Sequence, residues 1–240
     1  MKAGRYSEQC FFITGCSSGI GEAVAKNLME QGAIVYTLGR RTPVLVDHYP
    51  DQIHYSCCDF DDLDRLQSEL KKLSKTKTEF SGGVLCHGLG QFSGLEEFAY
   101  SQLESLVKVN LTSTIFMARF LLPILGRQPN SDLIFLGSES ALKGGKKGAV
   151  YCATKFALRG FAQSLRSECQ NRGLRISLIN PGMVDSPFFD NLDFSPGEDP
   201  ENAISVETVA DTVQYILSSP SNMVFDEINL SPLKSVIRNK

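Results

Sequence analysis

The chain has 240 residues, of which 42% are hydrophobic and 21% charged. These proportions are those of ordinary globular proteins and exclude long disordered stretches. The formal net charge is -3, so the chain lacks the surplus of lysine and arginine that binding to nucleic acid requires. We therefore expect one large α/β domain with no nucleic-acid partner.

The cysteines and the apolar stretches indicate a cytoplasmic protein that does not enter a membrane. The seven cysteines are an odd number and form no CxxC pair, which favours reduced thiols over a disulfide scaffold. The N-terminus has no apolar signal core, and the most apolar later stretch, Ile115–Leu125, is too short to span a bilayer. His54, Cys57 and Cys58 fall on one predicted strand and point to alternating faces, so we expect no metal site there.

In the first half of the chain, short apolar runs alternate with helical patterns. Strands are predicted at Cys10–Thr14, Ala33–Leu38, Ile53–Cys58 and Gly83–Cys86. Helices are predicted at Gly19–Gln31, in a short segment starting at Pro43, and from Asp61 or Asp62 to about Lys75.

The alternation continues to the end of the chain. Helices are predicted at Ser101–Leu125, Ala149–Asn171 and Val206–Ser218, and strands at Leu133–Leu136, Leu174–Ile179 and Met223–Leu230. Strands joined by crossover helices imply a parallel sheet with helices on both faces. We therefore predict an α/β fold over residues 1–240, a single-domain doubly wound Rossmann fold. The stretch 182–205, rich in Pro, Gly, Asp and Ser, is predicted to be a substrate lid.

A glycine-rich turn joins the first strand to the first helix. Glycine allows the sharp turn and the close approach of a pyrophosphate, and the helix N-terminus offers unpaired N–H groups to the anion. The spacing is Gly-x3-Gly-x-Gly, and its place between strand and helix favours a dinucleotide site over a purely structural turn. The residues that we expect to bind the cofactor here are Gly15, Ser17, Ser18, Gly19, Ile20 and Gly21.

The end of the second strand predicts which dinucleotide binds. NAD sites usually place an acidic residue there, to bind the ribose 2′-hydroxyl. This chain instead has Arg40 and Arg41, and a guanidinium pairs well with a 2′-phosphate. The cofactor is therefore predicted to be NADP(H), unless the two arginines are only solvated loop residues.

Tyr151 and Lys155 lie four residues apart on a predicted helix, on one face and one turn apart. A nearby ammonium stabilises a phenolate, so we expect Lys155 to lower the pKa of Tyr151 from about 10 toward the neutral range, where tyrosine can act as acid or base. Ser138 follows the fifth strand, at the sheet edge where such folds bind ligands. Asn110 lies within a helix, where asparagine is unfavourable. The alternative is an amphipathic surface pair with a tolerated polar residue.

Taken together, these motifs resemble the short-chain dehydrogenase/reductase family over nearly the whole chain. The segment Thr14–Gly21 is similar to the TGxxxGIG turn of that family. The resemblance implies a catalytic tetrad of Asn110, Ser138, Tyr151 and Lys155. Ser140 is a rival to Ser138, but the thirteen-residue spacing to Tyr151 favours Ser138. The resemblance also implies that further residues contact the cofactor: Asp59, Gly88, Tyr151, Lys155, Pro181, Gly182, Val184 and Ser186.

One motif departs from the family. The NNAG sequence that usually follows the fourth strand is here Leu85-Cys86-His87-Gly88. In the family an asparagine in this motif braces the sheet, so the local stability is in doubt. His87 is expected either to face the cofactor ribose or to pack or be solvated.

The resemblance implies an enzyme that transfers a hydride between NADP(H) and a carbonyl or secondary alcohol. Ser138 and Tyr151 would hold the substrate oxygen, Tyr151 would exchange its proton, Lys155 would hold the ribose and lower the tyrosine pKa, and Asn110 would position a water molecule. Two alternatives stay open. One is a dinucleotide-binding sensor or scaffold without turnover, and the other is a lyase or epimerase with a recycled cofactor.

The sequence leaves the substrate open. Lys143, Lys146 and Lys147 could attract an anionic substrate or be solvated, and Phe92, Phe188 and Phe189 could line an apolar pocket or pack the lid. The segment from Phe225 to Pro232 resembles the tail of reductases that act on small hydroxy acids and on amino acids such as serine. In the family, the helices equivalent to Ser101–Leu125 and Ala149–Asn171 form dimer interfaces, so the resemblance implies a homodimer or homotetramer.

Overall fold

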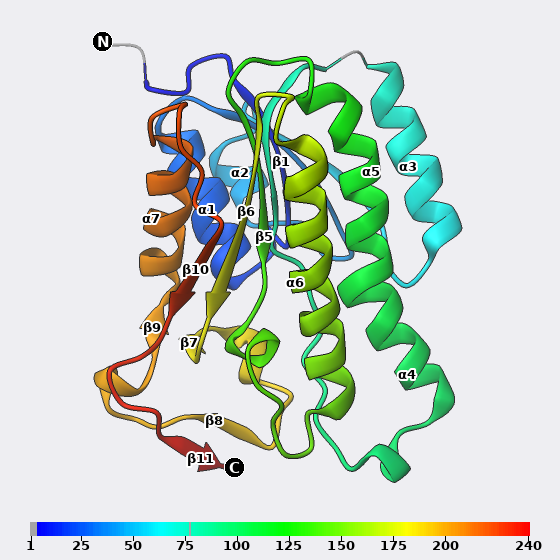
Figure 1. Ribbon diagram of the computed structural model, residues 1–240, viewed down its shortest axis with the longest axis vertical. Coiled ribbons are helices and arrows are strands. Elements are labelled where there is room, and N and C mark those ends of the chain that lie inside the picture. Colours follow the sequence, from blue (N-terminus) through cyan, green and yellow to red (C-terminus); the bar gives the residue numbers. More distant parts are fainter. Residues whose placement is uncertain (1–3, 77) are drawn as a thin grey trace.

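A computed structural model describes residues 4–76 and 78–240 and contains one central seven-stranded sheet (Figure 1). Its strands, in chain order, are β1 (Cys10–Thr14), β2 (Ile34–Gly39), β3 (Ile53–Cys57), β4 (Phe80–Leu85), β5 (Ser131–Leu136), β6 (Leu174–Pro181) and β10 (Glu227–Leu230). They lie in the order β10-β6-β5-β4-β1-β2-β3, and every neighbouring pair is parallel. The order reverses between β1 and β4, which is where doubly wound folds bind their ligands.

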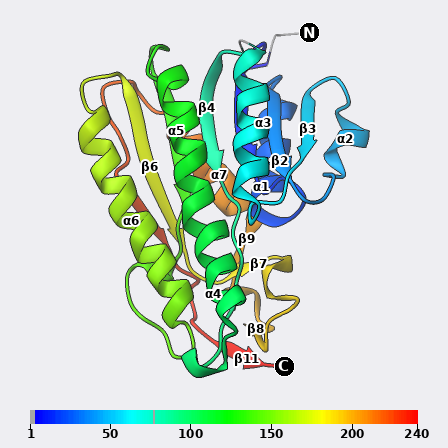
Figure 2. The same ribbon diagram turned by 90° about the vertical axis from the view of Figure 1, so that its right-hand side faces the viewer.

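Helices cover both faces of the sheet (Figures 1 and 2). Helices α1 (Gly19–Glu30) and α7 (Val206–Leu217) pack against each other on one face. The other face carries α3 (Leu63–Lys75), α4 (Tyr100–Val107), α5 (Ser113–Leu125) and α6 (Ala149–Cys169). The short helix α2 (Leu45–His48) contacts the edge strand β3. The predicted doubly wound Rossmann fold is confirmed.

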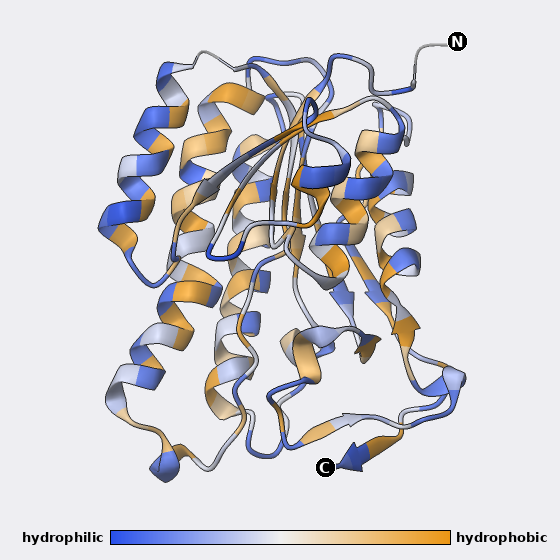
Figure 3. Cartoon of the chain, turned by 180° about the vertical axis from the view of Figure 1, so that it is seen from behind, coloured by the Kyte–Doolittle hydropathy of each residue, from blue (hydrophilic) through white to orange (hydrophobic). Residues whose placement is uncertain are grey.

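The core forms two clusters because alternate residues of each strand point to opposite faces. Phe11 and Ile13 of β1 belong to the cluster under α1 and α7, whereas Phe12 between them belongs to the cluster under α3, α5 and α6. Figure 3 shows the same division, with hydrophobic strands in the centre and hydrophilic residues on the outer sides of the helices. Both faces of the sheet are therefore buried, as parallel sheets require.

The predicted elements are present with small shifts at their ends. At α3, Asp62 is the N-cap, and its side chain accepts a hydrogen bond from the backbone N–H of Arg65 at 2.8 Å. Strand β4 begins at Phe80 rather than at Gly83, and β10 is shorter than the predicted Met223–Leu230. The stretch 182–205 is not a plain loop: it contains β7 (Val184–Asp185), β8 (Phe194–Pro196) and β9 (Ile204–Ser205).

Helices α4 and α5 form one continuous helix, Tyr100–Leu125, joined by the π-helical segment Lys108–Thr112. With 26 residues and a mean hydropathy of 1.2 in its most apolar window, this helix could cross a membrane by length and composition alone. The apolar helix is therefore longer than Ile115–Leu125, the apolar stretch that, in the sequence, is too short to span a bilayer. Its buried residues, including Met117 and Leu121, pack in the core under α3 and α6, which accounts for part of the apolar composition.

A buried ion pair joins the starts of β5 and β6. Arg175 donates two hydrogen bonds to the carboxylate of Asp132, at 2.9 and 2.7 Å, and both side chains are less than a tenth exposed. Arg175 also donates to the carbonyl oxygens of Ser219 and Pro220 after α7. Burial raises the pKa of Asp132, and the bonded Arg175 opposes that rise. The pair thus anchors the end of α7 to the edge of the sheet opposite the ligand-binding edge.

Replacing Asp132 by alanine should lower the free energy of unfolding by about 3–5 kcal/mol, because it leaves the Arg175 guanidinium buried without its carboxylate. The measurement is denaturant unfolding. Glu30→Ala serves as the control, since it removes the solvent-exposed pair with Lys26 and should cost less than about 1 kcal/mol. Equal losses in the two variants would contradict this prediction.

Candidate functional site

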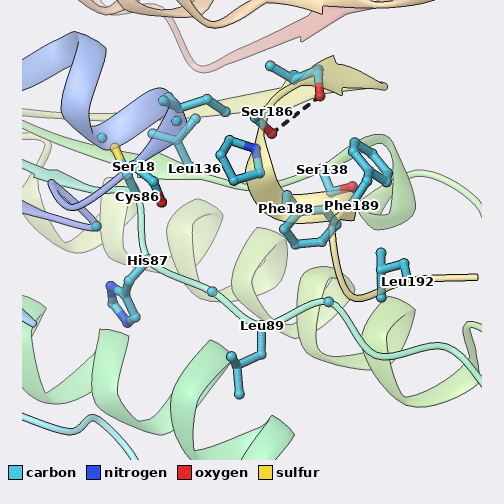
Figure 4. Close-up of a pocket in the computed structure, with 18 of the residues that line it drawn as sticks. Ser18, Cys86, His87, Leu89, Leu136, Ser138, Ser186, Phe188, Phe189 and Leu192 are labelled. Atoms are coloured by element: carbon cyan, nitrogen blue, oxygen red, sulfur yellow. Dashed lines mark hydrogen bonds between the residues drawn. The ribbon is translucent and has the colours of Figure 1, made fainter. Parts of the chain in front are cut away.

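A cavity of about 1010 Å³ runs along the carboxyl edge of the sheet (Figure 4). One end is lined by the turn between β1 and α1, and the other by residues of the stretch 182–205. The cavity wall includes all the residues that the sequence predicted for the site except Asn110, which lies just behind it. Parallel strands all end at this edge, which explains why residues far apart in the chain meet here.

The turn after β1 fits a dinucleotide. Gly15 and Gly19 have φ of +77° and +64°, a region that side chains disfavour. A Cβ on Gly21 would lie 2.5 Å from the carbonyl oxygen of Gly15, so the helix packs closely on the turn. Ser18 is the N-cap of α1, and its side chain makes no capping bond to the N–H groups of the first turn. This is the arrangement in which a helix N-terminus can receive a pyrophosphate.

Arg41 reaches across the mouth of this turn. Its guanidinium donates to the hydroxyl of Ser18 at 3.1 Å and to that of Ser17 at 3.4 Å. Arg40 also lines the cavity here, as does Asp59, whose carboxylate accepts the backbone N–H of Asp61 at 3.1 Å. Two exposed cations therefore stand at the end of β2, where an adenosine ribose would lie.

Tyr151 and Lys155 lie on the first turns of α6 and are both buried, at 6% and 5% exposure. The Lys155 ammonium is 5.8 Å from the centre of the Tyr151 ring and donates a 3.0 Å hydrogen bond to the carbonyl oxygen of Leu136. A Cβ on Gly88 would lie 3.7 Å from the same ammonium. The i, i+4 spacing thus brings the two side chains to one face, as predicted.

The predicted low pKa of the tyrosine is wrong for this structure. Burial raises the pKa of Tyr151 to about 12, and a hydrogen bond with the Ser138 hydroxyl opposes that rise only in part. Burial also lowers the pKa of Lys155 to about 8. Desolvation disfavours each charged form, and the ammonium lies beside the ring and bonds to the backbone instead of to the phenol oxygen. At pH 7, Tyr151 is therefore a neutral phenol and Lys155 is mostly protonated.

Ser138 follows β5, and a network of hydrogen bonds centred on Asn180 holds its backbone in place. We call this network the Asn180 bracket. The sequence did not predict it. The backbone N–H of Ser138 donates to the side-chain oxygen of Asn180 at 3.3 Å. The Asn180 amide in turn donates to the carboxylate of Glu227 at 2.6 Å and to the side chain of Asn229 at 2.9 Å. Arg159 of α6 pairs with Glu227 at 2.9 Å. The bracket fixes the end of β5 to β6, β10 and α6, so the Ser138 backbone has a defined position beside Tyr151.

Asn110 lies in the π-helical segment and is 1% exposed. Its side-chain oxygen accepts the backbone N–H of Leu89 at 2.7 Å, and its amide donates to the Leu89 carbonyl oxygen at 3.0 Å and to the Thr154 hydroxyl at 3.3 Å. The side chain is therefore fully used in tying the loop after β4 to α6. This explains why an asparagine is accommodated at a position that helix propensity disfavours.

His87 braces the sheet in place of the asparagine found in the family pattern. Its Nδ1 lies 2.8 Å from the Thr14 hydroxyl, and its Nε2 lies 2.9 Å from the Ser113 hydroxyl and 3.2 Å from that of Thr114. The Ser113 hydroxyl donates its hydrogen to the carbonyl oxygen of Val109, and the Thr114 hydroxyl donates to that of Asn110. Both hydroxyls can therefore only accept from His87, so Nε2 carries the ring proton. Nδ1 is then unprotonated and accepts from the Thr14 hydroxyl.

Burial lowers the pKa of His87 to about 3, which keeps the ring neutral. In Figure 4 the imidazole lies apart from Ser138 and Phe188, on the side of the loop toward the helices. The motif Leu85-Cys86-His87-Gly88 lacks the asparagine that braces the sheet in the family. The hydrogen bonds of His87 stabilise this part of the sheet instead.

The remaining predicted cofactor residues follow the ends of β4 and β6. Gly88, Pro181, Gly182, Val184 and Ser186 all line the cavity. The Gly182 N–H donates to the carbonyl oxygen of Leu230 at 2.7 Å, and the Ser186 hydroxyl donates to that of Val184 at 3.3 Å (Figure 4). No group of three His, Cys, Asp or Glu side chains within residues 4–76 and 78–240 is arranged to hold a metal ion.

Residues 237–240 lie against the stretch 182–205, a contact that the sequence does not predict. Strand β11 (Ile237–Asn239) pairs antiparallel with β8 (Figure 1). Beyond it, the Lys240 N–H donates to the carbonyl oxygen of Asp193 at 2.8 Å, and its ammonium bonds to that of Phe189. Ile237 and Asn239 line the cavity. The chain end therefore forms part of the wall that faces Tyr151 across the cavity.

Removing residues 233–240 should increase hydrogen exchange at the β8 amides by about tenfold or more, because β11 is the strand that pairs with β8. Hydrogen-exchange mass spectrometry measures this directly. The amides of β7 and β9 provide the internal control, since these two strands pair with each other and should be unchanged. Unchanged exchange at β8 would contradict the contact.

Comparison with known proteins gives a consistent result over most of the chain. The family model described as short chain dehydrogenase matches residues 9–195. An uncharacterized oxidoreductase of Staphylococcus epidermidis is 30% identical over 233 residues, which cover 95% of this chain and 99% of the relative. The family model therefore covers the glycine turn, Ser138, Tyr151 and Lys155.

Solved structures share the same fold. The chain superposes on an alcohol dehydrogenase of Thermococcus sibiricus complexed with 5-hydroxy-NADP, with a TM-score of 0.81, 24% identity and coverage of 92% of this chain and 95% of the other. Serine dehydrogenase from Escherichia coli gives a TM-score of 0.79 at 22% identity, covering 92% and 97%. At these identities the likeness shows the fold alone.

Proposed function

This chain belongs to the short-chain dehydrogenase family, and we propose that it transfers a hydride between NADP(H) and a carbonyl or secondary alcohol, with Tyr151 as general acid/base. The chain is an oxidoreductase of this family, whose members bind a nicotinamide dinucleotide and small-molecule substrates. One observation carries the finer proposal: the buried pair of Tyr151 and Lys155 lies in the same cavity as the glycine turn after β1.

In the direction of reduction, the Ser138 hydroxyl and the Tyr151 phenol hold the carbonyl oxygen. The nicotinamide supplies the hydride when bound. Tyr151 gives its proton to the oxygen as negative charge develops there, and its pKa of about 12 means that the phenol carries that proton at pH 7. The protonated Lys155 lies 5.8 Å from the centre of the ring that carries the developing phenolate, and the hydrogen bonds to the substrate oxygen strengthen in the transition state.

Asn110 is a positioning residue in this proposal. Its side chain holds the backbone of Leu89 and the Thr154 hydroxyl on α6, and so fixes the loop that follows Gly88. The role of Asn110 in ordering a water molecule rests on the resemblance to the family, while the hydrogen bonds support its part in fixing the geometry.

NADP(H) is the proposed cofactor because of Arg41 and its neighbour Arg40. The Arg41 guanidinium already bonds to Ser17 and Ser18 at the glycine turn, a position that suits a 2′-phosphate. The Thermococcus sibiricus structure, which was solved with 5-hydroxy-NADP, agrees with this assignment.

We further propose one domain in which 182–205 acts as a substrate lid, closing over the site from the side of β11. Exposed apolar residues on the outer surfaces of α4 and α6, Val107 and Phe156, support a homodimer or homotetramer formed through these helices. The seven cysteines are free, which supports a reducing cytoplasmic location.

A screen of carbonyl compounds that follows NADPH absorbance, with NADH run beside it, tests the function. In that assay Tyr151→Phe should lower kcat by about 10²- to 10⁴-fold, because the proton donor is lost. NADPH affinity, measured by fluorescence titration, should change by no more than about tenfold, because the variant removes at most one neutral hydrogen bond to the cofactor. Full activity of this variant would remove Tyr151 from the mechanism.

The same screen separates the alternatives. Tight NADPH binding without oxidation across a broad panel would favour a sensor or scaffold. Cofactor that copurifies with the protein and is recycled without net change would favour a lyase or epimerase. NADPH-dependent turnover that is lost in Tyr151→Phe supports the proposed oxidoreductase.

Arg41→Ala should weaken NADPH binding by about tenfold and leave NADH binding nearly unchanged, because only the former cofactor carries the 2′-phosphate. Fluorescence titration with each cofactor gives the two dissociation constants. Arg127→Ala is the matched control, since this exposed arginine follows α5 at the opposite edge of the sheet. An equal loss of affinity for both cofactors would show that Arg41 does not bind the 2′-phosphate of NADPH.

A further inference from the structure

Aromatic rings enclose the Tyr151 side chain inside the cavity. The Phe92 ring centre lies 4.9 Å from that of Tyr151, and the Phe188 ring centre lies 6.1 Å from it. Phe188 stands against Gly90, where an added Cβ would lie 2.4 Å from the ring. Because Gly90 has no side chain, the Phe188 ring can occupy this space. Phe92 and Phe188 thus approach the tyrosine from different segments of the chain.

A second group of apolar side chains lies behind these rings. Phe194 packs edge to face on Phe92 at 5.0 Å and contacts Phe189 at 5.8 Å, and Phe189 packs on Phe188 at 5.2 Å. The cluster is completed by Met183 and Leu192, both less than a tenth exposed. Figure 4 shows Phe188, Phe189 and Leu192 gathered at the end of the cavity that contains Ser138.

Most charged side chains of the cavity lie outside this cluster, and Asp193, which falls between Leu192 and Phe194 in the chain, is exposed to solvent. Arg40, Arg41 and Asp59 stand at the opposite end, beside the glycine turn. Lys155 is bonded to the Leu136 carbonyl oxygen. Glu139 follows Ser138, and its negative charge adds to the rise in the pKa of Tyr151. A substrate anion next to the tyrosine would therefore meet phenylalanine rings, the carboxylate of Glu139 and a single nearby cation, the Lys155 ammonium, which already donates to the backbone.

The lysines of the loop after Ser138 are poorly placed to serve as an anion receptor. Lys146 and Lys147 are exposed to solvent at the rim of the cavity, and the charge of Lys147 acts on the neighbouring carboxylate of Glu97. Exposed cations are screened by water and salt and add little to binding. Lys143 does not line the cavity.

We propose that the substrate of this site is a neutral carbonyl compound with an aromatic or similarly flat apolar group next to the carbonyl. This inference rests on the proposed function, because it takes the Tyr151 hydroxyl as the contact of the carbonyl oxygen. The flat group lies among Phe92, Phe188 and Phe194, where ring packing and the removal of apolar surface from water stabilise it. Small hydroxy acids and serine, which the chain-end resemblance suggested, fit this surface poorly.

Three ketones test the proposal: methyl 4-acetylbenzoate, its free acid 4-acetylbenzoate, and acetone. The first two differ in one methyl group, which removes the negative charge at the far side of the ring, and acetone lacks the ring. With NADPH, kcat/KM for the methyl ester should exceed that for each of the others by about tenfold or more. With NADP⁺, which cannot reduce the ketone, calorimetry should show the ester binding at least about tenfold more tightly than the acid.

Two variants of Phe188 make the test specific to the cluster. This ring is 36% exposed, so its replacement leaves little buried cavity and the fold should persist. Phe188→Ala should reduce the preference for the ester over acetone by about three- to tenfold. Phe188→Arg should shift the preference from the ester toward the free acid, because it adds a cation beside the ring. Tyr215→Ala is the control, since it removes an exposed ring on α7, and it should leave the preference unchanged.

The two measurements separate the proposals. If no ketone is reduced but the ester still binds more tightly than the acid in the presence of NADP⁺, the proposed function fails and the apolar pocket stands. If ketones are reduced but the acid or acetone is turned over as well as the ester, the apolar pocket is wrong and the proposed function stands. An unchanged preference in both Phe188 variants would also overturn the pocket.

Discussion

The burial of Tyr151 and Lys155 at one edge of the sheet is the constraint on which the rest of the site depends. Taking both groups out of water disfavours the phenolate and the ammonium alike, so the pKa of Tyr151 rises to about 12 and that of Lys155 falls to about 8. At pH 7 the ammonium is still mostly protonated, and it donates a hydrogen bond to the carbonyl oxygen of Leu136 at the end of β5. The result is a neutral proton donor beside a cation, which suits the donation of a proton to a developing alkoxide.

The apolar pocket and the high tyrosine pKa have one physical cause. Phe92 and Phe188 lie next to the phenol and keep water from it, and the same exclusion of water favours a flat apolar substituent on the substrate. An anionic substrate would have to be desolvated in this environment, where Glu139 adds a further negative charge. The proposed preference for a neutral substrate and the protonated state of Tyr151 therefore depend on the same two rings.

The sequence predicted what local patterns determine. Alternating strands and helices gave the parallel sheet, the glycine turn followed from its place between β1 and α1, and the i, i+4 spacing brought Tyr151 and Lys155 together. It did not predict the direction of the tyrosine pKa shift, because that depends on rings contributed by distant segments. The Asn180 bracket was missed for the same reason: its partners Glu227 and Asn229 are almost fifty residues away in the chain.

Two parts of the site differ in how firmly the fold fixes them. The edge that carries Ser138, Lys155 and His87 is built from strand ends and helix turns joined by buried hydrogen bonds, so its geometry follows from the core. The opposite wall combines Phe92 of the loop after β4 and Phe188 of the stretch 182–205 with the short strands β8 and β11, which pair with each other. Such a wall can change in sequence without disturbing the sheet. We infer that the reaction type is determined by the first part, and the size and polarity of the substrate by the second.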